Sequence, residues 1–263
     1  MNTSETGWLG IQGRSALVAG GTRSTGRGIA EGLADAGANV AVIGGSDEVA
    51  LASTVASLRD RDVRADGALV PFDRPEGIKP AVEKLAAAVG EFDILVVVTA
   101  LRPAVPIEDI SVEDWTRVMT VNAGAPFFLA QAVMPGMMRR GFGRIINFGG
   151  INFYWGRENR SHVVSSKGAI VGLSRALARD GAKSGVTVNT LVPGSIDTVT
   201  RNPEWYPDHQ DKRARQLDRV PLGRLGSIDE VVSTALFLAS PRSSFITGQE
   251  FFVTGGSHPL VQD

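Results

Sequence analysis

Seven short apolar runs recur along the chain, and the segments between them are longer and show helical periodicity. The apolar runs lie at 15–20, 39–44, 67–72, 93–99, 144–149, 187–192 and 250–255. The helical segments lie at 28–37, 47–60, 78–90, about 111–139, about 161–183 and 227–239. Strands that are apolar almost throughout are buried on both faces, which is typical of parallel sheets. The alternation therefore predicts an α/β fold, a doubly wound parallel seven-stranded sheet with helices on both faces.

The length of 263 residues fits one α/β domain whose single core buries most of the apolar surface, so we expect one domain over 1–263. The segment 199–225 departs from the alternation because it is polar and contains three prolines. Long insertions at the carboxyl edge of such a sheet commonly cover the ligand crevice. We therefore expect a substrate lid at about 199–225, with a solvated surface loop as the alternative.

The charged side chains nearly balance, with 27 Lys and Arg residues against 28 Asp and Glu residues. Such a chain has no overall field that would hold nucleic acid or an anionic membrane. No cysteine is present, and the three histidines lack the spacing of metal ligands. The first twelve residues do not resemble a signal peptide. We therefore expect a soluble, cytoplasmic protein that holds no metal and acts on a small-molecule substrate.

The turn after the first apolar run is rich in glycine and reads GGTRSTGRG over 20–28. Glycines in such a turn let the backbone approach a pyrophosphate, whose charge the N-terminus of the next helix stabilises. A glycine-rich turn alone is weak evidence, but its place between a strand and a helix favours a dinucleotide site.

Several longer segments strengthen this interpretation. The run LVAGGTRSTGRGIAEGLADAGANVAV resembles the opening of the short-chain dehydrogenase/reductase family. Further similar segments follow in order: VMTVNAGAPFFLAQAVMP (118–135), GRIINFGG (143–150), SSKGAIVGLSRALARD (165–180), VTVNTLVPGSIDT (186–198) and ITGQEFFVTGG (246–256). The resemblance covers nearly the whole chain, and it implies a Rossmann-type fold and an oxidoreductase.

The resemblance also implies which residues hold the cofactor. The family's glycine triad falls on Gly20, Ser24 and Gly26, so a serine replaces the middle glycine. Asp73 matches an adenine-contacting aspartate, and Lys167 matches the lysine that hydrogen-bonds the nicotinamide ribose. The full implied cofactor set is Gly20, Arg23, Ser24, Thr25, Gly26, Ser46, Asp73, Lys167, Pro193, Gly194, Ile196 and Thr198.

The choice of dinucleotide is read at the end of the second strand, where relatives that use NAD place an acid against the ribose 2′-OH. This chain has Gly44, Gly45 and Ser46 there, and its first carboxylate is Asp47. Arg23 matches the basic residue that relatives direct at the 2′-phosphate of NADP, where bidentate pairing is favourable. NADP(H) is therefore expected in preference to NAD(H), with Arg23 as a solvated turn residue as the alternative.

The catalytic pattern of the family is incomplete. Asn122 and Lys167 match two of its four active residues. The serine position falls on Gly150 and the tyrosine position on Val163, so the chain is an atypical member that lacks both hydroxyls. The family's NNAG segment also reads VVTA at 97–100. General acid catalysis of this kind contributes about 10²–10⁴ in rate, and valine cannot supply it.

Other side chains could take over proton transfer. Tyr154 and His162 are the candidates nearest to the lost hydroxyls, and each has a structural alternative, packing for Tyr154 and helix capping for His162. The catalytic set is then Asn122, Lys167, Tyr154 and His162, and the expected substrate pocket is Arg102, Gly150, Asn152, Arg160, Val163 and Tyr206.

Three functions remain open for such a chain. The first is hydride transfer to a C=O, C=N or conjugated C=C group in a small organic substrate, such as a biosynthetic intermediate. The arginines and aromatic residues of the expected lid suggest that this substrate is aromatic or anionic. The second is a non-redox cyclase, isomerase or lyase that retains NADP, since fold does not determine function. The third is a catalytically silent NADP-binding subunit. The resemblance also implies a homotetramer or homodimer.

Overall fold

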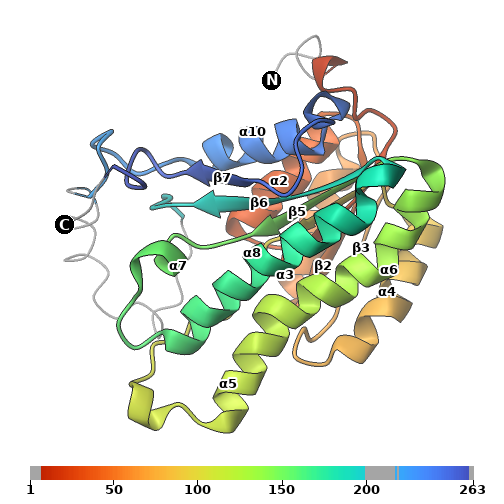
Figure 1. Cartoon of the computed structure of the whole chain (residues 1–263). Helices are drawn as coiled ribbons and strands as arrows, with labels where there is room; N and C mark the ends of the chain where they lie inside the picture. The colour runs from red at the N-terminus through yellow and green to blue at the C-terminus, as the bar shows by residue number, and fades with distance from the viewer. Residues whose placement is uncertain (1–6, 199–216, 218, 261–263) are drawn as a thin grey trace.

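The computed structural model describes residues 7–198, 217 and 219–260. Its centre is a seven-stranded parallel sheet in the order β3-β2-β1-β4-β5-β6-β7 (Figure 1). The strands are β1 (Ser15–Ala19), β2 (Asn39–Gly44), β3 (Ala65–Leu69), β4 (Ile94–Val97), β5 (Gly143–Phe148), β6 (Val186–Pro193) and β7 (Glu250–Val253). The predicted fold class, a doubly wound parallel seven-stranded sheet, is therefore confirmed.

Helices cover both faces of the sheet (Figure 1). One face carries α2 (Ser24–Asp35), α3 (Glu48–Arg59) and α10 (Ile228–Ala239). The other carries α4 (Ile78–Val89), α6 (Ala125–Arg140) and α8 (Ser161–Gly181), and α5 (Val112–Met119) packs beside α8. The short helix α7 (Asn152–Trp155) follows β5.

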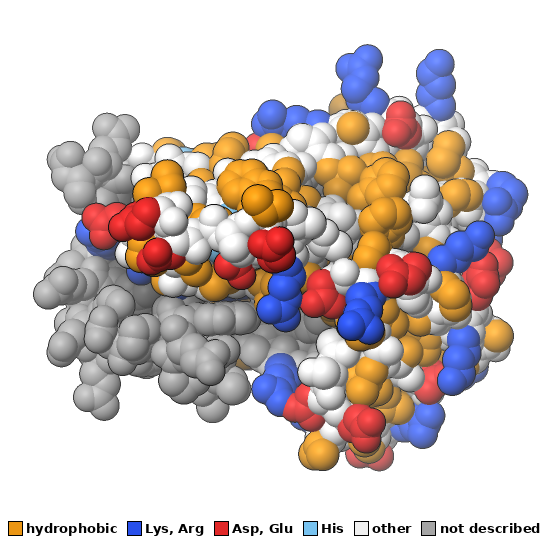
Figure 2. All heavy atoms as spheres, turned by 90° about the horizontal axis from the view of Figure 1, so that it is seen from below, with side chains coloured by type: hydrophobic (Ala, Val, Ile, Leu, Met, Phe, Trp, Pro, Cys, Tyr) orange, Lys and Arg blue, Asp and Glu red, His pale blue; other side chains and the backbone are white. Residues whose placement is uncertain are grey.

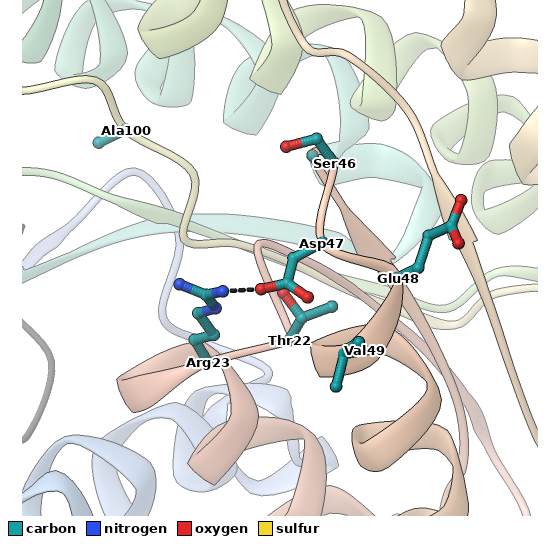
Figure 3. A pocket seen from close by; sticks show the side chains of 8 residues that line it. Thr22, Arg23, Ser46, Asp47, Glu48, Val49 and Ala100 are labelled. Atoms are coloured by element: carbon teal, nitrogen blue, oxygen red, sulfur yellow. Dashed lines mark ion pairs between the residues drawn. The ribbon is translucent and has the colours of Figure 1, made fainter.

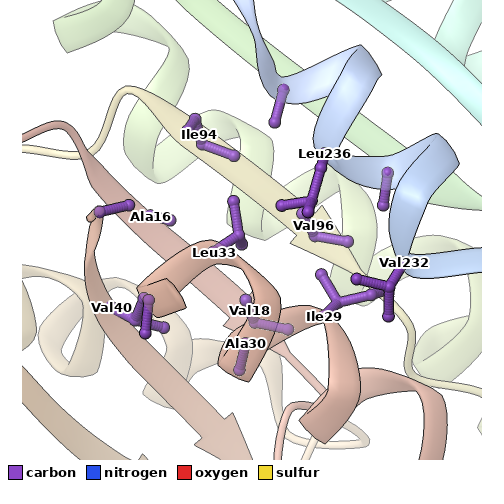
Figure 4. Close-up of a cluster of buried hydrophobic side chains, with 14 of the residues drawn as sticks. Ala16, Val18, Ile29, Ala30, Leu33, Val40, Ile94, Val96, Val232 and Leu236 are labelled. Atoms are coloured by element: carbon purple, nitrogen blue, oxygen red, sulfur yellow. The ribbon is translucent and has the colours of Figure 1, made fainter. Parts of the chain in front are cut away.

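Alternation along the strands divides the core into two layers. Val18 of β1 faces Ile29 and Leu33 of α2, together with Leu236 of α10, in the cluster of Figure 4. Leu17, its neighbour in sequence, belongs to the opposite cluster. Successive side chains of a strand point to opposite faces, so strands packed on both sides are apolar almost throughout. This is why the apolar runs identified the strands.

Three predicted boundaries need correction. The third strand was expected at 67–72 and lies at Ala65–Leu69. Its first two residues, Ala65 and Asp66, do not continue the apolar run, but their backbones pair with β2. The first predicted helical segment, expected at 28–37, is α2, which begins at Ser24 within the glycine-rich turn. The segment expected as one helix over 111–139 is interrupted by a π-helical turn, Thr120–Gly124. Such turns are frequent at functional sites, and this one carries Asn122.

The sheet order creates a crevice at the carboxyl ends of β1 and β4. From β1 the chain moves outward to β2 and β3, then returns to place β4 on the other side of β1. Ligands of doubly wound sheets bind where the strand order reverses in this way. Of the predicted lid at 199–225, residues 199–216 and 218 lie outside the described residues, and Tyr206 is among them.

One helical stretch within the described residues, Val112–Arg140, is long and apolar enough by length and composition to cross a membrane. Half of its most apolar window is buried inside the protein. A core helix of a globular domain has the same property, and this stretch packs against α4 and α8.

Candidate active site

The glycine-rich turn forms a tight cradle at the end of β1. Gly20 has a φ of 79°, in the left-handed region that glycine favours. A Cβ added at Gly26 would lie 2.0 Å from the Gly20 carbonyl oxygen, so a side chain at Gly26 cannot be accommodated. Ser24, which stands at the middle position of the triad, has a φ of 47°. The serine has therefore kept the backbone conformation expected of a glycine, at a steric cost.

The adjacent end of β4 contributes a buried hydroxyl group to this cradle. A Cβ at Gly20 would lie 3.0 Å from the Thr99 backbone nitrogen, so the two segments touch. The Thr99 side-chain oxygen is buried, and among the residues that the structure describes it has no hydrogen-bond partner. Buried polar groups are normally paired, and an orphan at a crevice indicates that a ligand completes the bonding. The cradle fits a dinucleotide phosphate group.

Beside the cradle lies an open pocket of about 760 Å³, which we call the Arg23 pocket. It is lined by Thr22, Arg23, Gly45, Ser46, Asp47, Glu48, Val49 and Ala100 (Figure 3). This volume lies within the range of small-molecule sites. The Arg23 guanidinium forms an ion pair with the Asp47 carboxylate across the pocket. Asp73 is engaged elsewhere, since its carboxylate lies 3.1 Å from Arg117 Nε on α5.

The segment after β6 lies against the C-terminal strand. The Gly194 backbone N–H donates to the Val253 carbonyl, and an added Cβ at Gly194 would lie 2.9 Å from Thr254 Cα. Ile196 forms a bridge with Gly226. Pro193 ends β6, and Thr198 is the last residue described before the gap. The implied cofactor residues thus follow the carboxyl edge of the sheet from β1 to β6.

Asn122 is fully buried and makes three hydrogen bonds. Its side-chain oxygen accepts from the Leu101 N–H at 2.7 Å, and its amide donates to the Leu101 carbonyl and to the Ser166 hydroxyl, both at 2.9 Å. Ser166 in turn donates to the Val163 carbonyl at 2.7 Å. Asn122 therefore joins the loop after β4 to the start of α8 through a fixed network.

Lys167 is 5% exposed, and its ammonium donates to the Phe148 carbonyl at 2.8 Å. No carboxylate in the described part of the chain forms a salt bridge with it. Burial, with a smaller contribution from the positive charge of Arg102, lowers the pKa of Lys167 to about 7. The amine can therefore gain and lose a proton near neutral pH.

The two positions without hydroxyls lie close to this lysine. A Cβ added at Gly150 would lie 3.2 Å from Lys167 Cγ. Val163 is one helical turn before Lys167 on α8 and is 5% exposed. Neither residue carries a proton that it could transfer. The Lys167 amine therefore has no hydroxyl group beside it at position 150 or at position 163.

Tyr154 packs in an aromatic cluster near the C-terminal segment. Its ring centroid lies 5.0 Å from that of Phe252 on β7 and 4.7 Å from that of His258. Phe153 adds a third neighbour at 4.9 Å. The Tyr154 hydroxyl is buried and, within the described ranges, has no hydrogen-bond partner. The packing role that was the structural alternative for Tyr154 is thus present.

His162 is fully buried, and both ring nitrogens lack hydrogen-bond partners among the described residues. Burial lowers the pKa of its imidazole, the carboxylate of Asp114 on α5 opposes this, and the cation of Arg160 adds to it. The influence of Asp114 indicates that His162 lies near the contact between α5 and α8.

Two arginines and an asparagine belong to the expected substrate pocket. Arg160 precedes α8, is 5% exposed and donates to the Arg102 carbonyl at 2.5 Å. The Arg102 side chain is exposed, and its charge reaches Lys167 as described above. Asn152 begins α7 and is half-buried.

Sequence reasoning did not assign roles to Thr99, Asp47 or Ser166. Thr99 lies in the segment that departs from the family pattern, and that departure was its signal. Asp47 begins a helical segment directly after the second strand, a position that favours an N-cap. Nothing in the sequence indicated that Ser166 bridges Asn122 and Val163, because that contact joins separate segments.

Comparison with known proteins identifies relatives over nearly the full length. The family described as enoyl-(acyl carrier protein) reductase matches residues 19–258. The 3-oxoacyl-(acyl-carrier-protein) reductase FabG of Escherichia coli K12 is 34% identical over 251 residues, which are 95% of this chain and 99% of that protein. Gluconate 5-dehydrogenase of Gluconobacter oxydans is 31% identical over 246 residues, 94% of this chain and 95% of that protein.

The solved structures agree. The crystal structure of a provisionally assigned gluconate dehydrogenase from Agrobacterium tumefaciens is similar with a TM-score of 0.89 and 31% identity. The match covers 95% of this chain and 98% of that one. A provisionally assigned short-chain alcohol dehydrogenase from Sinorhizobium meliloti is similar with a TM-score of 0.88 and 31% identity, over 94% of this chain and 97% of that one.

Proposed function

The chain belongs to the short-chain dehydrogenase/reductase family and is an oxidoreductase of that family, and from this premise we propose an NADP(H)-dependent enzyme with a non-standard active site. Its substrate is a small organic molecule that carries a C=O, C=N or conjugated C=C group. Two relatives of nearly equal identity are named for different substrates, a 3-oxoacyl group and gluconate. Sequence identity therefore does not select a substrate, and the residues of the site must do so.

The observation that carries this proposal is the environment of Lys167. Its amine is buried, has a pKa of about 7, and lies beside Gly150 and one turn after Val163. A reductase of simple ketones needs an acid that protonates the developing alkoxide. An iminium carbon already carries its positive charge, and a conjugated C=C needs a weaker acid. These acceptors, the iminium and the enone, therefore suit the site best.

The chain's own residues would hold the dinucleotide along the carboxyl edge of the sheet. Gly20 and Gly26 leave room for the pyrophosphate, and the Thr99 hydroxyl is free to donate to it. As the family resemblance implies, the Lys167 ammonium would donate a hydrogen bond to a ribose hydroxyl of the nicotinamide half. When bound, the dinucleotide supplies or accepts the hydride.

The candidates for proton transfer differ in what surrounds them. Lys167 carries a titratable amine beside Gly150, and Asn122 braces the helix turn before it through Ser166. Tyr154 lies in the aromatic cluster and His162 near the contact with α5. We therefore place Lys167 first among the four candidates. Arg102, exposed near Lys167, favours an anionic or electron-rich substrate.

We further propose a single-domain enzyme of the cytoplasm that assembles as a homotetramer or homodimer. Helices α5, α6 and α8 would form the interface. Trp115 on α5 and Phe127 on α6 are about two-fifths exposed, and a Cβ at Gly172 on α8 would meet no atom within 4 Å. Figure 2, seen from below Figure 1, shows hydrophobic side chains between charges of both signs. Light scattering that gives a 27.8 kDa monomer would reject the assembly.

The experiment is a paired fluorescence titration with NADPH and NADH, followed by a panel of ketones, cyclic imines and enones. We expect tighter binding of NADPH, and oxidation of NADPH with imines or enones at rates at least 10²-fold above those with ketones. Binding without oxidation of any acceptor would contradict the redox proposal. Absence of binding would contradict the dinucleotide site itself.

Three variants distinguish the proton donors. If Tyr154 or His162 transfers the proton, Tyr154→Phe or His162→Ala lowers turnover at least tenfold while dinucleotide affinity is unchanged. If Lys167 transfers it, both variants retain turnover and Lys167→Met loses it. Unchanged turnover in all three would remove every one of these assignments.

A further inference from the structure

The ion pair between Arg23 and Asp47 lies in the Arg23 pocket, where the turn after β1 meets the loop after β2 (Figure 3). Arg23 lies in the turn after β1, and Asp47 lies between β2 and α3. The Arg23 side chain is 57% exposed and that of Asp47 is 35% exposed, so both can reach a ligand in the pocket.

Asp47 is held in place by a second interaction. One oxygen of its carboxylate accepts the Ala50 N–H at 2.8 Å and caps α3, while the other faces Arg23. Because this hydrogen bond caps the helix, Asp47 does not leave its position freely. The Arg23 side chain has no such second anchor among the residues that the structure describes. Of the two partners, the arginine is therefore the one that moves.

The carboxylates that line the pocket disfavour the binding of a 2′-phosphate. Arg23 is the cationic residue of the lining, whereas Asp47 and Glu48 are both carboxylates. A 2′-phosphate carries nearly two negative charges, and it must compete with Asp47 for the same guanidinium. A ribose 2′-OH instead donates a hydrogen bond to a carboxylate such as Asp47. The pocket therefore contains a residue that favours each type of dinucleotide.

We propose that Asp47 is a specificity-determining residue that competes with the 2′-phosphate for Arg23 and so limits the preference of the site for NADP(H) over NAD(H). This inference rests on the proposed function, because it requires that the chain binds a dinucleotide. The inference goes beyond that function in one respect: the wild-type protein prefers NADP(H) over NAD(H) only modestly, because the Asp47 carboxylate limits this preference.

The test compares the affinities of Asp47→Asn, Glu48→Gln and the wild-type protein for NADPH and NADH by fluorescence titration at constant ionic strength. Asparagine keeps the oxygen that caps α3 and removes only the charge. Glu48→Gln removes a charge from the same pocket outside the pair and is the matched control. We expect the ratio of Kd for NADH to Kd for NADPH to rise about five- to tenfold in Asp47→Asn, and less than twofold in Glu48→Gln.

A third variant tests whether the effect of Asp47 depends on Arg23. Arg23→Ala combined with Asp47→Asn should show no such rise, because the freed guanidinium is gone. Should Asp47→Asn melt well below the wild type, Asp47→Ser provides a second substitution that keeps the cap.

The outcomes are distinct. An unchanged ratio in folded Asp47→Asn overturns the inference while the proposed function stands. An equal rise in Glu48→Gln also overturns it, since the effect would then be general electrostatics. If the wild type binds neither dinucleotide, the proposed function fails and the inference fails with it.

Discussion

A Cβ at Gly150 would lie 3.2 Å from Cγ of Lys167, so the stem of the buried lysine runs directly beside this glycine. The amine beyond that stem is held by the Phe148 carbonyl. Gly150, where the family resemblance implies a catalytic serine, is thus in contact with Lys167, whose pKa is lowered by burial. Restoring side chains around Lys167 is therefore a direct test of the proposed mechanism.

The double variant Gly150→Ser with Val163→Tyr should gain ketone reductase activity of about 10²-fold or more, because it adds a phenol that can donate a proton to the developing alkoxide. Initial rates with a ketone panel and NADPH measure this. Val163 is 5% exposed, so tyrosine adds bulk that costs about 1–3 kcal/mol of stability, measured by urea unfolding. The control, Gly150→Ser with Val163→Phe, has the same bulk without the hydroxyl. Equal rates in both would show that acid was not limiting.

Burial of Lys167 should make the apo protein more stable at pH 9 than at pH 7. The pKa of Lys167 falls from its ordinary 10.5 to about 7 in the folded protein, so between these values the unfolded chain binds more protons. The free energy of unfolding then rises with pH, by up to about 1.4 kcal/mol per pH unit. Urea unfolding of Lys167→Met should lack this rise. Lys79→Met, which changes an exposed lysine, should retain it.

His162 should make the protein sensitive to acid. Burial lowers the pKa of its imidazole from the ordinary 6.5, so the unfolded chain binds more protons as the pH falls below about 7. The stability contributed by the neutral ring is lost as the pH falls through the folded-state pKa. Thermal unfolding between pH 7.5 and 5 should show a smaller loss for His162→Leu than for the wild type. The same slope in both would place the acid sensitivity elsewhere, and His258→Gln is the control.

Ser24→Gly should stabilise the protein. Ser24 has a φ of 47°, and a left-handed residue with a side chain costs about 1–2 kcal/mol. Glycine removes this strain but costs about 0.5–1 kcal/mol in chain entropy, so a net gain of about 0.5–1 kcal/mol is expected. Ser24→Ala keeps the strain and should show no gain. Urea unfolding decides between them, and equal stability of all three proteins would mean that the turn is not strained.

Much of the fold was predictable because the spacing of apolar residues and glycines along the chain reflects the geometry of strands, helices and turns. Residues 16–19 of the first run are all apolar, and such an unbroken run is typical of a strand whose two faces are both covered. Gly20 and Gly26 likewise indicated a tight turn, and the structure shows the positive φ and the 2.0 Å approach that require glycine. Membership of the oxidoreductase family was also predicted and is confirmed by the relatives.

The sequence by itself determined the parallel sheet, the position of the glycine cradle and the absence of hydroxyls at Gly150 and Val163, because each of these depends on residue type and short-range spacing. Only the tertiary structure decided the environment of each functional group. Tyr154 meets Phe252 and His258 about a hundred residues away, and Arg23 meets Asp47 from a different loop. Burial likewise lowers the pKa of Lys167, since the energy of a charge depends on packing around it rather than on its neighbours in sequence.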